Sequence, residues 1–259
     1  MTDAPLDWFD TYLLRRPDLL ERPLPERPVT VHVQGEGGEW RDLEDWPPPT
    51  STPTRWYLHA GGRLAVDAPT ATNGATATVA PPDRFRYDPA DPTPSVGGIG
   101  MLTGGAVDNR TLEARPDVLV YTSDPFAEAL ELVGPVSAEL VVESSLDHTD
   151  FFVRVCDVHP DGSSVNVCDG LQRFEPSTIS RAADGTFRAA LRVWPIGHRF
   201  APGHRLRVQV SSGAHPVYAR NLGTGEAPAT ATQMRGADQA VHHGPGKESF
   251  VTLPHFRAG

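Results

Sequence analysis

Apolar and polar residues alternate in short segments along most of this chain, a pattern typical of β-strands with one buried face. The alternation predicts strands at residues 29–33, 55–59, 118–122, 136–143, 151–158, 165–168, 185–193, 204–211 and 249–253. Most of these segments are bounded by Gly, Pro, Asp or Ser, which is the turn spacing expected of a sandwich. The pattern therefore predicts an all-β sandwich.

One segment near the N-terminus has helical rather than alternating periodicity. Apolar residues recur at helical spacing from Leu6 to Leu13, and Pro17 ends the pattern. A proline-rich connector follows. The chain thus divides into an N-terminal helix with its connector, residues 1–28, and a β-sandwich domain, residues 29–259.

Composition supports the all-β prediction. The 259 residues include 24 Gly and 26 Pro, a density of breakers that excludes long helices, while 39% hydrophobic residues suffice for a core. Pro and Gly are concentrated in a loop at residues 88–105. Long ordered loops of this kind are more often functional than merely connecting.

Charge and hydropathy narrow the range of partners and compartments. The net charge is −10 and the basic residues are scattered singly, which argues against a nucleic-acid partner. The apolar runs are short and the first ten residues are acidic, so we expect no membrane span and no secretory signal. These features predict a cytoplasmic protein.

Residues 149–173 predict a β-hairpin that contains both cysteines of the chain. With a three-residue loop at 161–163, Cys156 and Cys168 would face each other, and a disulfide between them is geometrically conceivable. Because disulfides are rare in the cytosol, we expect instead two buried or half-buried thiols.

Motifs for nucleophilic catalysis are absent. The chain has no G-x-S-x-G elbow, and the nearest match, Ser211-Ser212-Gly213 with His215 close by, follows a strand with no helix behind it. We therefore predict no catalytic residue.

Metal and cofactor motifs are likewise not found. His242-His243 and the group Asp147, His148 and Asp150 lack a spacing that fixes metal geometry, and we interpret both as solvated polar loops. Residues 157–168 depart from a calcium loop at the third and twelfth positions. No cofactor and no metal are predicted.

Three long strings resemble a known family. ARPDVLVYTSDPF at 114–126, LELVGPVSAELVVESSLDHTDFFVRVCDVHPDGSSVNVCDG at 130–170 and FAPGHRLRVQVSSGAHPVYARNLGTGE at 200–226 closely resemble the C-terminal jelly-roll domain of CocE/NonD-type serine hydrolases, which include X-prolyl dipeptidyl peptidases. The resemblance implies a jelly-roll, galactose-binding-like β-sandwich with a short N-terminal helix and long Pro/Gly-rich loops.

The resemblance also implies that the catalytic Ser/Asp/His triad belongs to a separate α/β-hydrolase domain. The segment at 6–14 looks like the helix that leads from that domain into the sandwich. We therefore expect Trp8, Phe9 and Leu13 to pack on an α/β-hydrolase polypeptide or, alternatively, to form a homo-oligomer.

In this family the loop after the Gly-Gly pair is expected to reach the substrate pocket. Matched by position, the resemblance implies that Ile99, Gly100, Met101 and Leu102 form part of the pocket wall. The alternative is a loop that only covers one end of the sandwich.

The expected function is thus that of a non-catalytic C-terminal domain that packs on an α/β-hydrolase partner and shapes its pocket. Two alternatives remain open. One is a stand-alone carbohydrate-binding module, for which jelly rolls are often used. The other is a family hydrolase that lacks its catalytic domain. The hairpin aspartates Asp150, Asp157, Asp161 and Asp169 are expected to act as turn and strand-end hydrogen-bonding groups.

Overall fold

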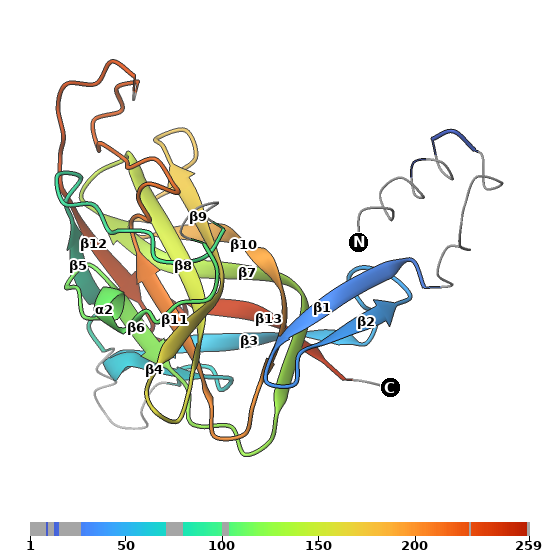
Figure 1. Ribbon diagram of the computed structural model, residues 1–259. Helices are drawn as coiled ribbons and strands as arrows, with labels where there is room; N and C mark the ends of the chain where they lie inside the picture. The colour runs from blue at the N-terminus through green and yellow to red at the C-terminus, as the bar shows by residue number, and fades with distance from the viewer. Residues whose placement is uncertain are drawn as a thin grey trace.

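Strands dominate the computed structural model, which describes residues 9, 13–15, 27–70, 80–99, 104–227 and 229–257 (Figure 1). The strands are β1 Val29–Gly35, β2 Glu39–Leu43, β3 Ser51–His59, β4 Arg63–Ala65, β5 Asp83–Tyr87, β6 Leu119–Thr122, β7 Leu130–Ser144, β8 Thr149–Val158, β9 Ser164–Phe174, β10 Phe187–Phe200, β11 Arg205–Ser211, β12 Ala237–His242 and β13 Phe250–Phe256. Between them lie the short 3₁₀ turn η2, Ala60–Gly62, and the short helix α2, Arg110–Glu113. The prediction of an all-β sandwich is confirmed.

The strands form one continuous sheet that curls into two layers. Its order is β2-β1-β10-β7-β13-β3-β4-β6-β11-β8-β9, and β12 pairs with both β7 and β5. One layer contains β10, β7, β13 and β3, and the other contains β6, β11, β8 and β9. Strand β4 connects them, since it is antiparallel to β3 and parallel to β6.

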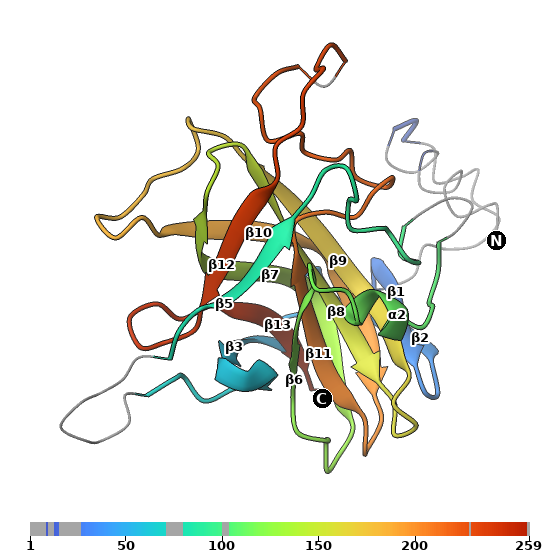
Figure 2. The ribbon, with the colours of Figure 1, turned by 90° about the vertical axis from the view of Figure 1, so that its left-hand side faces the viewer.

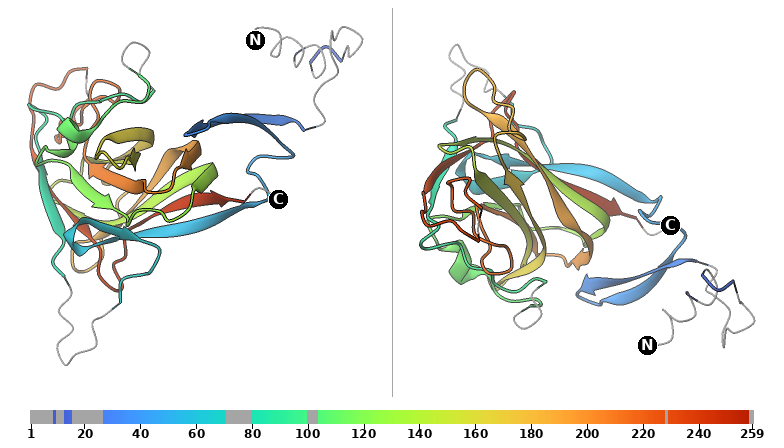
Figure 3. Two further views of the ribbon diagram at one scale, coloured as in Figure 1. Left: turned by 60° about the horizontal axis from the view of Figure 1, so that its bottom comes forward. Right: turned by 90° about the horizontal axis from the view of Figure 1, so that it is seen from above.

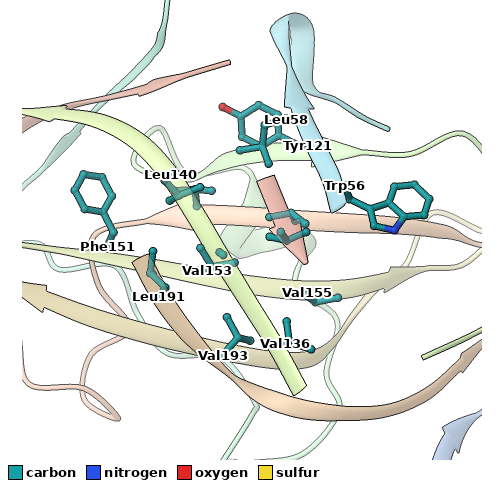
Figure 4. Close-up of a cluster of buried hydrophobic side chains, with 14 of the residues drawn as sticks. Trp56, Leu58, Tyr121, Val136, Leu140, Phe151, Val153, Val155, Leu191 and Val193 are labelled. Carbon is teal, nitrogen blue, oxygen red and sulfur yellow. The ribbon is translucent and has the colours of Figure 1, made fainter. Parts of the chain in front are cut away.

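The hydrophobic core fills the space between the two layers (Figure 4). Phe151, Val153 and Val155 of β8 are completely buried, and Leu140 of β7 and Leu191 of β10 belong to the same cluster. These residues occupy alternate positions on their strands, so that one face of each strand points inward. Burial of each such side chain contributes about 1.5–3 kcal/mol.

The β1–β2 hairpin lies to one side of this body (Figure 3). It joins the main sheet where Gln34 and Gly35 of β1 pair in parallel with β10. A Cβ atom on Gly35 would lie only 2.2 Å from the backbone oxygen of Arg199, so the pairing requires glycine there. A small cluster of Val33, Leu43 and Val133 packs the hairpin against β7.

Sequence patterns did not predict four of the strands: β2, β4, β5 and β12. Strand β12 shows the reason, because its buried face carries Gln239. This amide donates hydrogen bonds to Thr149 Oγ1 (2.6 Å) and Ser212 Oγ (3.0 Å). A buried polar residue whose partners lie on other elements breaks the local apolar pattern.

The turn between β8 and β9 is longer than the sequence predicts. Val158 pairs with Ser164, so the turn comprises residues 159–163 rather than 161–163. Asp161 caps it, because its Oδ1 accepts hydrogen bonds from the backbone nitrogen (2.9 Å) and the Oγ (2.7 Å) of Ser163. The expected turn role of Asp161 is therefore confirmed.

The predicted facing of the two cysteines is wrong. A bulge shifts the register, so that Val155 lies opposite Cys168 and Cys156 lies opposite Asn166. Neighbouring residues of a strand point to opposite faces, which places the thiols on opposite sides of the β8–β9 pair. Both are free and buried, as the thiol prediction expects.

The interpretation as solvated loops fits Asp147, whose side chain is 62% exposed in the turn before β8, but it is wrong for His242, His243 and Asp150. His242 ends strand β12 and contacts Glu143 through its Nε2 at 2.8 Å. His243 is only 3% exposed. Asp150 is buried in β8, where Arg173 donates two hydrogen bonds to its carboxylate. These side chains support pairing between strands, which local spacing cannot show.

Of the three N-terminal side chains predicted to pack on a partner, those of Phe9 and Leu13 are described. Phe9 is helical, its backbone oxygen accepts a hydrogen bond from the Leu13 nitrogen (2.9 Å), and the two residues are 47% and 65% exposed. Trp8 lies outside the described residues. In the described part of the chain, no helix has the length and apolar character needed to cross a membrane.

Candidate functional site: a braced loop beside a surface hollow

The chain between β5 and β6 crosses the outer face of β8 (Figure 2). Strand β8 is consequently buried along its whole length, on the outer face as well as on the core face. On the outer face, the guanidinium group of Arg154 binds the crossing segment. This arrangement holds the loop predicted to form a pocket wall.

Arg154 of β8 is the centre of these contacts and is only 2% exposed. Its guanidinium donates to Asp169 Oδ2 on β9 (2.9 Å from Nη2) and to the backbone oxygen of Val96 (2.6 Å from Nη1). A third hydrogen bond, also from Nη1, goes to Asn109 Oδ1 (2.8 Å). One buried cation therefore connects β8, β9 and both ends of the crossing loop.

Asn166 of β9 binds the part of the loop that leads to helix α2, at Gly105 and Val107. Its Oδ1 accepts a hydrogen bond from the backbone nitrogen of Val107 (2.9 Å), and its Nδ2 donates to the backbone oxygen of Gly105 (2.9 Å). Gly98 and Gly105 exchange two backbone hydrogen bonds of 2.9 and 2.8 Å. These bonds bring the two sides of the loop together at Gly98 and Gly105.

Glycine is required at positions 97 and 98, just before the loop residues that follow Gly98. Gly97 and Gly98 have φ values of 64° and 78°, in the left-handed region. A Cβ atom on Gly97 would lie 2.6 Å from the backbone oxygen of Gly105, and one on Gly98 would lie 3.0 Å from Asp169 Oδ2. At Gly98 the loop lies so close to the Arg154–Asp169 pair that a Cβ atom would crowd the Asp169 carboxylate.

Helix α2 fixes the far end of the crossing segment. Glu113 accepts hydrogen bonds from Ser164 Oγ (2.6 Å), from Gln209 Nε2 (2.8 Å) and from Arg207 Nη1 (2.5 Å). Gln209 Nε2 also contacts Cys156 Sγ at 3.3 Å. Burial raises the pKa of the Cys156 thiol to about 12, so this sulfur is neutral and inert at physiological pH.

A surface hollow of about 310 Å³ lies between β10 and the Pro/Gly-rich loop at residues 88–105, which we call the braced loop. Ile99 and Trp194 both line it and are each 55% exposed. Trp194 points outward because it continues the alternation of β10, in which Arg188 and Arg192 are exposed as well. Polar side chains, including those of Gln34, Asn166 and Asp169, complete the lining.

Of the four residues predicted for the pocket wall, the structure describes one. Ile99 lies at the rim of the hollow, whereas Gly100, Met101 and Leu102 are outside the described residues. Sequence reasoning assigned Trp194 to core or loop packing and did not place it at this site. A sequence signal for an irregular position was available, because Pro195 follows Trp194 and proline within a sheet marks an edge or a bulge.

The serines of the nearest catalytic-looking match have structural partners. Ser211 Oγ donates to the backbone oxygen of Gly213 (3.1 Å), and Ser212 Oγ accepts a hydrogen bond from Gln239. Both serines are buried. The Ser211 hydroxyl thus stabilises the turn after β11, and the Ser212 hydroxyl contacts β12.

Comparison with known proteins identifies the family to which this sandwich is similar. Residues 25–252 match the family described as the X-Pro dipeptidyl-peptidase C-terminal non-catalytic domain. The cocaine esterase of Rhodococcus sp. (strain MB1 Bresler) is 37% identical over an alignment of 264 residues, which covers 95% of this chain and 44% of that protein. A putative serine esterase of Mycobacterium tuberculosis (strain CDC 1551 / Oshkosh) is 28% identical over 221 residues, covering 72% of this chain and 32% of that protein.

Solved structures show the same fold. An α-amino acid ester hydrolase superposes with a TM-score of 0.79 and 27% identity, over 96% of this chain and 43% of that one. An aminopeptidase from a marine-sediment Thaumarchaeota archaeon gives a TM-score of 0.77 at 24% identity, over 98% of this chain and 43% of that one. The chain therefore spans less than half the length of these relatives.

Proposed function

Because this chain belongs to the family of X-Pro dipeptidyl-peptidase C-terminal non-catalytic domains, we propose that its sandwich packs on an α/β-hydrolase catalytic domain. In this proposal the braced loop and the hollow beside it face that domain and form part of its pocket wall. The catalytic domain supplies the nucleophile, and this chain supplies shape and contacts.

The observation that carries the proposal is the position of Ile99 and Trp194 at one hollow. Both side chains are 55% exposed; Trp194 lies on strand β10, and Ile99 follows Gly98, which is hydrogen-bonded to Gly105. Exposed tryptophan held in a rigid setting is typical of interface anchors. Burying these two side chains against a second domain removes apolar surface from water at about 25 cal/mol per Å².

The bracing beneath the loop supports the same proposal. Arg154 and Asp169 are nearly solvent-free, and forming a buried ion pair has a large desolvation cost. That cost is reasonable where a loop must keep one conformation in order to shape a neighbouring site. A loop that only covered the end of the sandwich would not need a buried ion pair to fix its conformation.

The substrate proposal follows from the names of the relatives. Ester hydrolysis is named for the cocaine esterase and the α-amino acid ester hydrolase, and X-Pro dipeptide cleavage is named in the family description. We propose that the complete enzyme hydrolyses an ester or an X-Pro peptide on its catalytic domain. The hollow is lined by both polar and apolar groups and would contact one end of such a substrate.

A second contact is proposed for the N-terminal segment. Leu13 and Leu14 are 65% and 62% exposed, and such side chains are commonly covered in a larger assembly. The proposed partner surface is the same catalytic domain, with self-association of the chain as the alternative. The proposed location is the cytoplasm, which the two free cysteines support.

The test pairs this chain with an α/β-hydrolase polypeptide encoded next to it or continuous with it. The two are co-expressed, and complex formation is measured by analytical ultracentrifugation. Hydrolysis of p-nitrophenyl esters and of Ala-Pro-p-nitroanilide is then measured with and without this chain. We expect a 1:1 assembly with higher activity, and absence of both would refute the proposal.

Matched variants locate the contact. Trp194→Ser and Ile99→Ser should weaken assembly by at least about tenfold, since a hot-spot residue contributes about 2 kcal/mol or more. Trp40→Ser and Val66→Ser remove equally exposed side chains, 62% and 53% exposed, that do not line the hollow. If the control variants weaken assembly as much as the first pair, the hollow is not the contact. Self-association of the chain alone that is lost in Leu13→Ser would favour the homo-oligomer.

A further inference from the structure

A second cluster of chemically active side chains lies where the β8–β9 and β10–β11 turns meet, at the lower end of the sandwich in Figure 1. Asp157 is next to last in β8, and His159 begins the following turn. His198 lies near the end of β10, and His204 immediately precedes β11. Four residues from three strand ends thus converge on one point.

The Asp157 carboxylate is the centre of the cluster, with only 4% of its side chain exposed. It accepts hydrogen bonds from His204 Nδ1 (2.8 Å to Oδ1) and from His198 Nε2 (2.9 Å to Oδ2). His159 Nε2 lies 4.0 Å from Oδ2, and the rings of His159 and His204 are 4.5 Å apart. Among the residues that the structure describes, no arginine or lysine forms an ion pair with this carboxylate.

We propose that Asp157, His159 and His204 bind a divalent transition-metal ion, with Zn²⁺ the best suited. One ligand atom from each residue can be chosen so that all three lie within 4.8 Å of one another. Two imidazole nitrogens and one carboxylate oxygen are a common donor set for zinc, which binds such ligands at about 2.0–2.2 Å. A fourth position remains for water.

Little movement is needed to close the site. Ligand atoms of a tetrahedral zinc ion lie roughly 3.3–3.5 Å apart, so the 4.0 Å between His159 Nε2 and Asp157 Oδ2 must shorten. His159 is the member best able to move, because it lies on the turn and its side chain is 40% exposed. Asp157 Oδ1 and His204 Nδ1, which are 2.8 Å apart, must separate by about 0.5 Å to admit the ion.

His198 acts as a positioning residue. Its Nε2 hydrogen bond to Asp157 Oδ2 holds the carboxylate plane, and its ring packs edge-on against Phe200 at 4.8 Å. Ligating carboxylates commonly have such a hydrogen-bond partner, which fixes their orientation. The ion replaces the proton between His204 Nδ1 and Asp157, and that proton passes to solvent.

The site is made entirely of residues from this chain and is independent of the proposed hydrolase partner. Asp157 and His198 belong to opposite layers of the sandwich. A bound ion would therefore join the end of β8 to the start of β11, and the hydrogen bond of His198 would link it to the other layer.

The experiment uses the full chain without any affinity tag, dialysed against a chelator. Titration with ZnCl₂ in a calorimeter should give one ion per chain, with release of about one proton detected by comparing buffers of different ionisation enthalpy. Co²⁺ should give the visible absorption of a four-coordinate site. No saturable binding of Zn²⁺ would mean that the cluster is hydrogen-bonded only, and would overturn the proposal.

Variants identify the ligands. His159→Gln removes an exposed ligand and should weaken binding by more than tenfold, with the native circular dichroism retained. His198→Gln should weaken binding by about 10–100-fold, the usual effect of losing a ligand's hydrogen-bond partner. His148→Gln removes a half-buried histidine from another turn and serves as the control. If His159→Gln and His148→Gln bind Zn²⁺ equally, the proposal is wrong.

Discussion

Arg154 and Asp169 face each other across the β8–β9 pair, with 2.9 Å between Nη2 and Oδ2 and with 2% and 7% of their side chains exposed. They are register partners on the outer face of the sheet, and the loop that carries Ile99 crosses directly over them. Loop position and sandwich stability therefore depend on the same ion pair.

Arg154→Met should destabilise the protein by about 3–5 kcal/mol, because it leaves the Asp169 carboxylate buried without a partner. Urea unfolding measures the change. The double variant Arg154→Met/Asp169→Leu should lose less than the sum of the single variants. Arg188→Met is the control, since Arg188 pairs with Glu139 at the surface and should contribute about 1 kcal/mol or less. Equal losses for the two arginine variants would show that burial of the first pair has no energetic consequence.

Gly98→Ala should be more costly than Gly105→Ala. Both residues have positive φ, 78° and 100°, so both variants incur the strain of a left-handed residue, about 1–2 kcal/mol. Only at Gly98 would the new Cβ approach Asp169 Oδ2, at 3.0 Å, whereas nothing lies within 4 Å at Gly105. Hydrogen exchange should report faster opening of residues 94–109 in Gly98→Ala alone. Identical exchange in both variants would mean that backbone strain accounts for the whole effect.

Trp194→Ser should leave the free energy of unfolding within about 0.5 kcal/mol of the parent, as for surface substitutions in general. The reason is its 55% exposure on a bulge. Phe151→Ala, at a fully buried position, should cost about 3–5 kcal/mol by comparison. Thermal and urea unfolding provide the measurement. A large loss in Trp194→Ser would assign this tryptophan to structure rather than to docking.

Acidification should destabilise the contact between Trp56 and His255. Trp56 Nε1 donates to His255 Nε2 at 3.1 Å, so that nitrogen must be unprotonated. Burial lowers the pKa of His255 below its ordinary value of 6.5. Below pH 6.5 the unfolded chain therefore takes up a proton that the folded chain does not, and stability falls until the lowered pKa of the folded state is reached.

His255→Gln should reduce this loss, because a glutamine oxygen can still accept the hydrogen bond and does not titrate. The difference in slope between the variant and the parent, from pH 7 to pH 5, is at most about 1.4 kcal/mol per pH unit for one proton. Urea unfolding at several pH values measures it. Parallel pH profiles for the two proteins would rule out a contribution from His255.

Native protein should resist thiol reagents. Cys156 and Cys168 are 0% and 8% exposed, and burial raises the pKa of both thiols. Dithionitrobenzoate should label neither in buffer and both in urea, as two free cysteines require. One thiol fewer in urea under non-reducing conditions would indicate oxidation, and a bridge between the two would contradict their opposite faces.

Much of the sandwich could be predicted from the sequence because strand identity is a local property. Alternation at Val153 and Val155 marks a buried face wherever the strand finally pairs, and the Asp161 turn is formed by neighbouring residues. The exposed loop at Ile99 could be located from its Gly/Pro content and from the family resemblance. These features depend on side chains only a few residues apart.

Only the tertiary structure determined the register and the polar clusters. The bulge at Val155 separates the cysteines, and the bulge in β10 after Val193 shifts its register against β7, but a one-residue slip leaves the local pattern unchanged. Arg154 is hydrogen-bonded to Val96, 58 positions away in the sequence, and Asp157 is hydrogen-bonded to His198, 41 positions away. Such contacts depend on how distant strands pair, and no periodicity within either strand records that pairing.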